Sequence, residues 1–255
     1  MMRNALLKLA GVAFVAVAMG GTAVAQPLKV GVAAEPYPPF SSVDSSGNWE
    51  GFDVDIAMAI CEEMDRECVV TPVAWDGIIP ALTSEKIDMI VSSMSITEER
   101  QQVISFSDRY YYTPAAYVAP KPVEIDVTKP DLGGKILGVQ TSTTSATFAE
   151  KTFPEAEIKV YNTQDEANAD LAAGRIDVTL ADQAAMEEYL KTPEAAEFEI
   201  KAVAPEDPAF GDGIGVGLRK KDEELRTSIN TAIAALLDNG KYDEIADKYF
   251  DFDIY

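Results

Sequence analysis

Short apolar runs and longer amphipathic segments alternate along the chain from Leu28 onwards. Runs short enough for buried strands occur at Leu28–Val32, Val69–Val73, Ile87–Val91 and Ile136–Gln140. Helical spacing or helix-start signals predict helices at Phe52–Met64, Trp75–Leu82, Asp222–Asp238 and Tyr242–Tyr249. Strands that alternate with helices are typical of proteins with mostly parallel sheets. The pattern therefore predicts the α/β class.

One sequence pattern occurs twice. Leu82–Val91 (LTSEKIDMIV) aligns without gaps on Leu171–Leu180 (LAAGRIDVTL), and each copy leads from a helix end through Ile-Asp into a short apolar strand. Because equivalent βαβ units place equivalent strand ends in equivalent sites, the repeat predicts two similar α/β lobes. We expect lobe 1 over 26–114, lobe 2 over 115–206, and a return to lobe 1 over 207–255. Such a path gives two hinge strands.

The first 25 residues have the features of a targeting segment. Arg3 and Lys8 supply positive charge, Leu6–Met19 is apolar, and Ala23–Ala25 gives a small-x-small cleavage pattern. This order predicts a signal peptide over residues 1–25 that is removed on export. We therefore expect a soluble protein located in the periplasm.

The chain is strongly acidic, with 21 basic and 43 acidic residues and a formal charge of −22. Such a charge repels phosphate backbones, so we expect no nucleic-acid partner. Solubility is the simple explanation of the acidity, and attraction of a cationic ligand is the alternative.

Histidine is absent from the chain. Its absence removes the usual general base, Ser-His-Asp triads and most catalytic zinc sites. The sequence also contains no phosphate-binding loop of the G-x-x-x-x-G-K type. These features favour binding over catalysis, and we expect neither a cofactor nor a metal.

The segment that follows the predicted strand Ile87–Val91 carries the clearest binding signal. Ser92, Ser93 and Ser95 precede Arg100, and Thr97 is a plausible helix N-cap between them. Strand ends that lead into helices are common ligand sites in α/β sheets. An arginine fork matches a carboxylate, so we predict half of a carboxylate site here. The alternative is that Arg100 only pairs with a surface acid such as one of the two glutamates beside it.

The two cysteines, Cys61 and Cys68, lie seven residues apart. On one continuous helix this spacing separates their Cα atoms by ~10 Å, too far for a disulfide. A disulfide therefore requires the helix to end near Met64 and Asp65–Glu67 to turn the chain back. Export favours the disulfide. Two reduced, buried thiols are the alternative.

Four segments together resemble one family: SSMSITEERQQVISFSD, CEEMDREC, LAAGRIDVTLADQ and FGDGIGVGLRKKDEEL. They are similar to the periplasmic amino-acid-binding proteins of ABC importers (bacterial solute-binding protein family 3), especially the lysine/arginine/ornithine- and histidine-binding branch. The resemblance covers almost the whole mature chain. It implies the two-lobe periplasmic-binding-protein (venus-flytrap) fold with two hinge strands, and a non-enzymatic receptor that delivers a polar, basic L-amino acid to a membrane permease. We expect a monomer.

The resemblance also assigns roles to individual residues. Arg100 would bind the ligand α-carboxylate together with the N–H of Thr144, and Asp182 would bind the α-ammonium group. The residues expected to contact the amino-acid backbone are Ser92, Ser93 and Ser95. The two cysteines match the disulfide of the basic-ligand branch. Asp182 could instead act only as a helix N-cap, and Thr144 only as a turn or cap residue.

The same resemblance predicts the side-chain pocket. Tyr37 and Trp75 match an aromatic pair that sandwiches the ligand side chain, and Gln140 matches a wall position; the alternative for both aromatics is a core role. The chain departs from the basic-ligand branch at Ala34, where that branch carries an aspartate. We expect either that Glu35 replaces this acid or that the pocket takes a neutral polar amino acid or a derivative.

Two further functions remain open from the sequence. One is a periplasmic dehydratase of prephenate-like substrates on the same scaffold, with Glu35 or Asp182 as the general acid. The other is a sensory subunit that acts with a separate transmembrane receptor.

Overall fold

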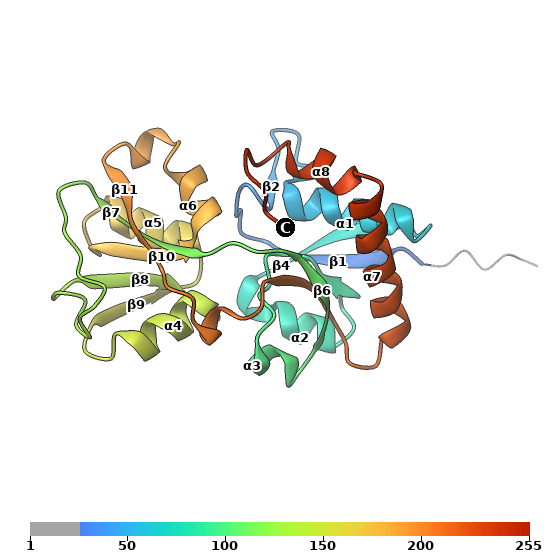
Figure 1. Ribbon diagram of the computed structural model, residues 1–255, viewed down its shortest axis with the longest axis horizontal. Helices are drawn as coiled ribbons and strands as arrows, with labels where there is room; N and C mark the ends of the chain where they lie inside the picture. Colours follow the sequence, from blue (N-terminus) through green and yellow to red (C-terminus); the bar gives the residue numbers. More distant parts are fainter. Residues whose placement is uncertain (1–25) are drawn as a thin grey trace, which may run out of the picture.

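The computed structural model describes residues 26–255, and the predicted signal peptide lies outside this range. The described chain forms two α/β lobes that lie side by side (Figure 1). Each lobe contains one five-stranded sheet, and a two-stranded hairpin, β2 (Ser42–Val43) and β3 (Trp49–Glu50), accompanies the first. The predicted two-lobe α/β fold is therefore confirmed, whereas the residue limits given for the lobes remain predictions.

Lobe 1 is built from both ends of the described chain. Its strands are β1 (Leu28–Ala33), β4 (Cys68–Val73), β5 (Met89–Ile90), β6 (Ser105–Tyr111) and β12 (Ile214–Leu218). Its helices are α1 (Phe52–Glu63), α2 (Ile78–Thr83), α3 (Glu98–Gln101), α7 (Glu223–Asp238) and α8 (Lys241–Ala246). The sheet order is β4-β1-β5-β12-β6. β1 runs parallel to β4 and β5, whereas β12 runs antiparallel to β5 and β6.

Lobe 2 comes from the middle of the chain. Its strands are β7 (Ala115–Pro120), β8 (Ile136–Gln140), β9 (Glu157–Tyr161), β10 (Val178–Asp182) and β11 (Phe198–Val203). Its helices are α4 (Thr144–Thr152), α5 (Gln164–Ala172) and α6 (Gln183–Tyr189). The order is β11-β7-β10-β8-β9, with β8 parallel to both neighbours and β7 antiparallel to both of its own.

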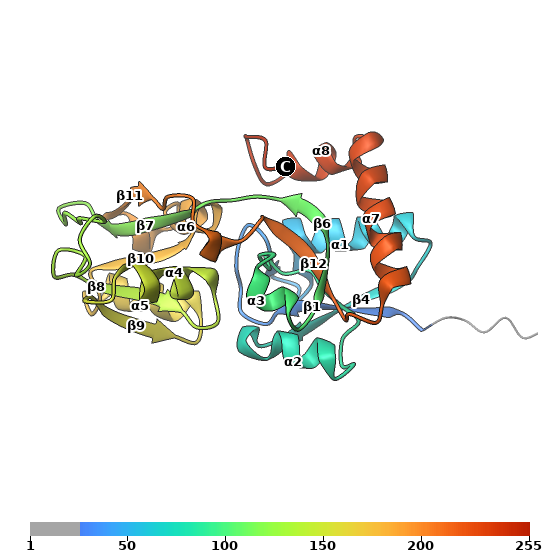
Figure 2. The same cartoon turned by 60° about the horizontal axis from the view of Figure 1, so that its bottom comes forward.

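The chain crosses between the lobes twice. The first crossing joins β6 to β7 through residues 112–114, and the second joins β11 to β12 through residues 204–213. Both crossings are visible in Figures 1 and 2, in green and orange. After the second crossing, α7 and α8 pack against α1, so the end of the chain completes the first lobe.

The repeated pattern adopts the same local structure in both lobes. The helix that precedes each strand ends in a left-handed residue, Glu85 with φ of 63° after α2 and Gly174 with φ of 68° after α5. A left-handed residue at this point is a common way to end a helix. The two positions correspond in the alignment of Leu82–Val91 with Leu171–Leu180, so the repeat reflects two equivalent βαβ units.

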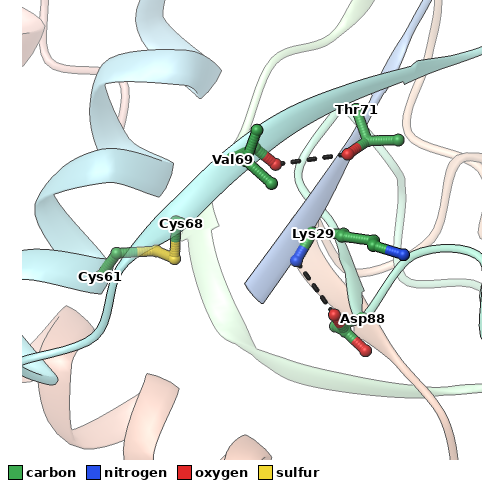
Figure 3. Close-up of a disulfide and its surroundings, with 6 residues drawn as sticks. All are labelled: Lys29, Cys61, Cys68, Val69, Thr71 and Asp88. Atoms are coloured by element: carbon green, nitrogen blue, oxygen red, sulfur yellow. Dashed lines mark hydrogen bonds between the residues drawn. A yellow bond between two sulfur atoms is a disulfide. The ribbon is translucent and has the colours of Figure 1, made fainter. Parts of the chain in front are cut away.

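The two cysteines form a disulfide between the end of α1 and the start of β4 (Figure 3). Helix α1 ends at Glu63, and Asp65 then adopts a φ of 51°, which turns the chain back. This turn brings the Cα atoms of Cys61 and Cys68 to 6.2 Å. The expected disulfide is confirmed, together with the early helix end that it requires.

Some predicted elements differ in extent. The predicted helix Trp75–Leu82 begins as a 3-10 turn at Trp75–Gly77, and regular α-helix starts only at Ile78. Pro80 explains the late start because it has no N–H to donate to the carbonyl of Asp76 four residues earlier. The predicted helix Tyr242–Tyr249 is shorter, and regular helix ends at Ala246. Within residues 26–255, no helix is long and apolar enough to cross a membrane.

Candidate ligand-binding site

A cavity of about 100 Å³ lies between the lobes. One water needs roughly 10–15 Å³ by the same kind of measure, so the cavity can hold a small molecule. All ten residues that the sequence predicts for the ligand site line it: Glu35, Tyr37, Trp75, Ser92, Ser93, Ser95, Arg100, Gln140, Thr144 and Asp182. The structure therefore brings together residues from both lobes, while their individual roles remain predictions.

Arg100 supplies a positive charge to this cavity. Thr97 caps α3 by accepting a hydrogen bond from the Arg100 N–H at 3.2 Å, as predicted, and this cap fixes where the arginine leaves the helix. The guanidinium donates to the carbonyl of Ser95 at 3.0 Å and lies 5.4 Å from the ring centre of Trp75. Burial lowers its pKa to about 10, so it stays charged at neutral pH. Arg100 forms no ion pair with any described residue, and the surface-pair alternative is wrong.

The start of helix α4 faces the same cavity. Thr143 is its N-cap and accepts a hydrogen bond from the Ala146 N–H at 3.1 Å. Thr144 and Ser145 follow as the first helical residues, and both line the cavity. Backbone N–H groups in the first turn of a helix have no partner within the helix and favour anions. Thr144 is therefore not the cap itself, and its N–H remains available.

Asp182 supplies a negative charge from the end of β10. One carboxylate oxygen caps α6 by accepting from the N–H groups of Ala184 at 2.9 Å and Ala185 at 3.4 Å. The other oxygen accepts from the hydroxyl of Thr113, in the first crossing. Burial raises the pKa of Asp182 to about 6, although these hydrogen bonds act in the opposite direction. Asp182 is therefore the N-cap of α6, and because it also lines the cavity its role towards a ligand stays a prediction.

Glu35 and the two aromatic residues form another part of the wall. Glu35 is half-buried and accepts a hydrogen bond from the backbone N–H of Trp75 at 3.3 Å. Ala34 is exposed and does not line the cavity. Tyr37 stacks on Phe40 at 6.0 Å between ring centres. The loop thus directs an acid and an aromatic ring inward. A sandwich of the ligand between Tyr37 and Trp75 stays a prediction.

The three serines act through different groups. The Ser92 hydroxyl accepts from the Ala33 N–H at 2.9 Å and so ties β1 to the chain after β5. Ser93 donates both its N–H and its hydroxyl to the carboxylate of Asp53, at 2.6 and 2.9 Å. The Ser95 carbonyl accepts a hydrogen bond from the Arg100 guanidinium. The serine segment is therefore held by these hydrogen bonds at the wall of the cavity, which all three residues line.

Asp53 is missing from the sequence-based site. It lies in α1 and is fully buried, whereas the sequence predicted only that Phe52–Met64 is helical. A helical signal could have found it: Asp53 precedes Ala57 and Ile60 by four and seven residues, so it lies on their apolar face.

Gln164, at the start of α5, was also missed. It is buried and lines the cavity. Its amide nitrogen donates to Asn168 at 2.9 Å and to Thr179 at 3.1 Å. Since the Thr179 hydroxyl donates to the carbonyl of Gly138 at 3.1 Å, it can only accept from Gln164, which fixes the amide orientation. The carbonyl oxygen of Gln164 is left without a donor among residues 26–255.

Comparisons with known proteins agree with this geometry. The family described as bacterial extracellular solute-binding proteins, family 3, matches residues 28–252. The L-arginine-binding protein of Pseudomonas aeruginosa is 43% identical to this chain over 234 residues, 90% of each protein. The lysine/arginine/ornithine-binding periplasmic protein of Escherichia coli is 42% identical over 223 residues, 86% of each.

A solved structure shows the same arrangement of lobes. It is an ancestral arginine-binding protein bound to arginine, with a TM-score of 0.82 and 34% sequence identity. The match covers 89% of this chain and 99% of that one, so it includes both sheets and both crossings.

Proposed function

The chain belongs to family 3 of the bacterial extracellular solute-binding proteins, and from this premise we propose that it captures a basic L-amino acid between its lobes. The closed complex then delivers the ligand to the permease of an ABC importer in the bacterial envelope. The periplasm is the compartment in which this delivery takes place. The relatives that are named binding proteins support binding rather than catalysis.

The observation that carries the proposal is the balance of charges that line the cavity. Arg100 is the single cationic residue of the lining, and Glu35 and Asp182 are the acidic ones. An α-amino acid brings a carboxylate for Arg100 and an ammonium group for Asp182. Glu35 is then left without a cationic partner, and a positively charged ligand side chain supplies it. The acid at Glu35 thus takes the place of the one missing at Ala34.

The second candidate is a neutral polar amino acid such as glutamine. The hydrogen bond from the Trp75 N–H to Glu35 supports it, because this bond partly satisfies the carboxylate without a ligand. The two candidates differ in one measurable property, the dependence of affinity on the charge at Glu35.

Binding is tested first by thermal shift with L-arginine, L-lysine, L-ornithine, L-histidine and L-glutamine, followed by calorimetry. A ligand that binds the folded state raises the melting temperature by mass action. We expect the basic ligands to give the largest shifts. Arg100→Ala should weaken binding at least about 30-fold, since an unpaired carboxylate in the closed site costs about 2 kcal/mol or more. Unchanged affinity in this variant contradicts the site.

The basic preference is tested with Glu35→Gln. We expect this variant to lose at least tenfold in affinity for L-arginine and less than threefold for L-glutamine, because only the arginine side chain needs the charge. Asp76→Asn is the matched control: it removes an exposed acid next to Trp75 that does not line the cavity. Equal losses for both ligands favour the neutral-ligand candidate.

Catalysis remains the less supported alternative. A dehydratase would use Glu35 or Asp182 as the general acid, since no histidine is present. Turnover of a prephenate-like substrate by the purified protein, lost in Asp182→Asn, would replace the binding proposal.

A further inference from the structure

Asp53 lies behind the cavity wall as a fully buried carboxylate. It accepts three hydrogen bonds: the Ser93 N–H at 2.6 Å, the Ser93 hydroxyl at 2.9 Å and the Tyr110 hydroxyl at 2.7 Å. Among the residues of the described chain, no lysine or arginine forms an ion pair with it. A buried carboxylate without a cationic partner destabilises a fold, so its presence calls for a compensating role.

Ser93 is the residue through which Asp53 reaches the cavity. It adopts a left-handed φ of 49°, which is uncommon for a residue other than glycine, asparagine or aspartate. The two hydrogen bonds to Asp53 hold it in this conformation from the side of α1. Ser93 itself lines the cavity.

These contacts decide which groups Ser93 can offer to a ligand. A serine has two hydrogen-bond donors, the N–H and the O–H, and both point to Asp53. Among the polar atoms of Ser93, the carbonyl oxygen remains as an acceptor to which no described residue donates, whereas the hydroxyl oxygen also lies next to the buried hydroxyl of Tyr111. Ser93 therefore favours a ligand group that donates hydrogen bonds and disfavours a carboxylate.

Asp182 faces the same region from lobe 2. Its negative charge is the smallest of the named causes that act on the pKa of Asp53, and it raises that pKa. Burial is the larger cause and brings the pKa of Asp53 to about 6, which leaves it mostly ionised at neutral pH. Ser93 thus contacts one buried carboxylate and shares the cavity wall with a second, whereas Arg100 offers a positive charge to the other end of a ligand.

We propose that Asp53 is a positioning residue for ligand binding: it fixes Ser93 as an acceptor-only wall that, with Asp182, receives the α-ammonium group. Because this rests on the proposed function, it predicts how binding responds to the α-ammonium in particular. Asp53 makes no contact with the ligand and acts through the orientation and polarity of Ser93.

The test compares two ligands at neutral pH by calorimetry: L-arginine, and 5-guanidinopentanoic acid, which lacks only the α-amino group. Asp53→Asn keeps the size of the side chain and removes its charge. We expect affinity for L-arginine to fall at least tenfold and affinity for 5-guanidinopentanoic acid to stay within threefold. Asp55→Asn is the control, since it removes the next acid of α1, which pairs with Lys248 on the surface at 3.0 Å; both affinities should stay within twofold.

Equal losses for the two ligands overturn the proposal, because they indicate that Asp53 only supports the fold. An unchanged affinity for L-arginine overturns it as well. If Asp53→Asn does not fold, Ser93→Ala is decisive: it must lower the ratio of the two affinities at least threefold, and an unchanged ratio refutes the role. Failure of the unaltered chain to bind any amino acid instead contradicts the proposed function.

Discussion

At the scale of single residues, the cavity combines ionised groups whose environments differ. Arg100 remains charged despite its burial because its pKa falls only to about 10. The charges of Asp182 and Asp53 are closer to titration at physiological pH, because burial raises the pKa of each carboxyl to about 6. In the proposed site a ligand ammonium group needs the ionised form of Asp182, so protonation is expected to compete with binding.

Affinity for L-arginine should therefore depend on pH. With a pKa of about 6 only about a tenth of Asp182 is ionised at pH 5, so we expect roughly tenfold weaker binding at pH 5 than at pH 7. Calorimetry across this range measures the effect. 5-Guanidinopentanoic acid, without the ammonium group, should bind equally at both values, and a pH-independent affinity for L-arginine contradicts the assignment of Asp182.

Stability without ligand should show the opposite trend. Because the pKa of Asp182 and Asp53 is higher in the folded than in the unfolded chain, the folded state binds protons more tightly between about pH 4 and 6. These two groups thus make the protein less stable as the pH rises through that window, and in the proposed complex the ligand ammonium group would give ionised Asp182 a cationic partner.

At the scale of elements, helix ends and strand ends bring the functional groups to the cavity. The repeated aspartates act at the opposite edge of each sheet, where the strands begin: Asp88 accepts from the Lys29 N–H at 3.0 Å and Asp177 from the Ile136 N–H at 2.9 Å (Figure 3 shows the first pair). Each aspartate ties its strand to the start of the neighbouring parallel strand. The two lobes therefore align their parallel strands in the same way at the start, and the opposite ends of β5 and β10 lead to Ser92 and Asp182 at the cavity.

The disulfide belongs to this scale because it fixes the connection of α1 to β4. Replacing Cys61 and Cys68 together by alanine should lower the free energy of unfolding by roughly 2–3 kcal/mol, as expected for a short closed loop. Urea unfolding measures the change. Neither cysteine lines the cavity, so affinity for L-arginine should stay within twofold. A larger loss of affinity indicates that the disulfide also positions α1, and hence Asp53.

At the scale of the whole molecule, the lobes meet through a backbone carbonyl. Ser142 of lobe 2 accepts from the Trp75 indole N–H at 3.3 Å and from the Arg100 guanidinium at 3.1 Å. Both donors belong to lobe 1, and both residues line the cavity. The residues that connect the lobes here thus also line the cavity, so a ligand bound there would favour this arrangement of the lobes.

Trp75→Phe tests this coupling. Phenylalanine keeps an aromatic wall but cannot donate to Ser142, and a lost hydrogen bond of about 1 kcal/mol disfavours the closed state about fivefold. We expect affinity for L-arginine to weaken by about that factor in calorimetry. Trp49→Phe is the matched control, because Trp49 lies in lobe 1 away from the cavity and should leave affinity unchanged. An equal effect of both substitutions contradicts a role in closure.

The sequence by itself determined the α/β class, the two lobes, the disulfide and ten of the residues that line the cavity. Apolar periodicity, caps and cysteine spacing are local signals, and the resemblance to a known family supplied the positions that they do not reach. Only the tertiary structure showed that Asp53, Thr113 and Gln164 lie at or directly behind the cavity wall. Their roles depend on partners far along the chain, such as Ser93 forty residues after Asp53. A single sequence shows that an acid is present, but only packing decides whether it is solvated or buried beneath a ligand site.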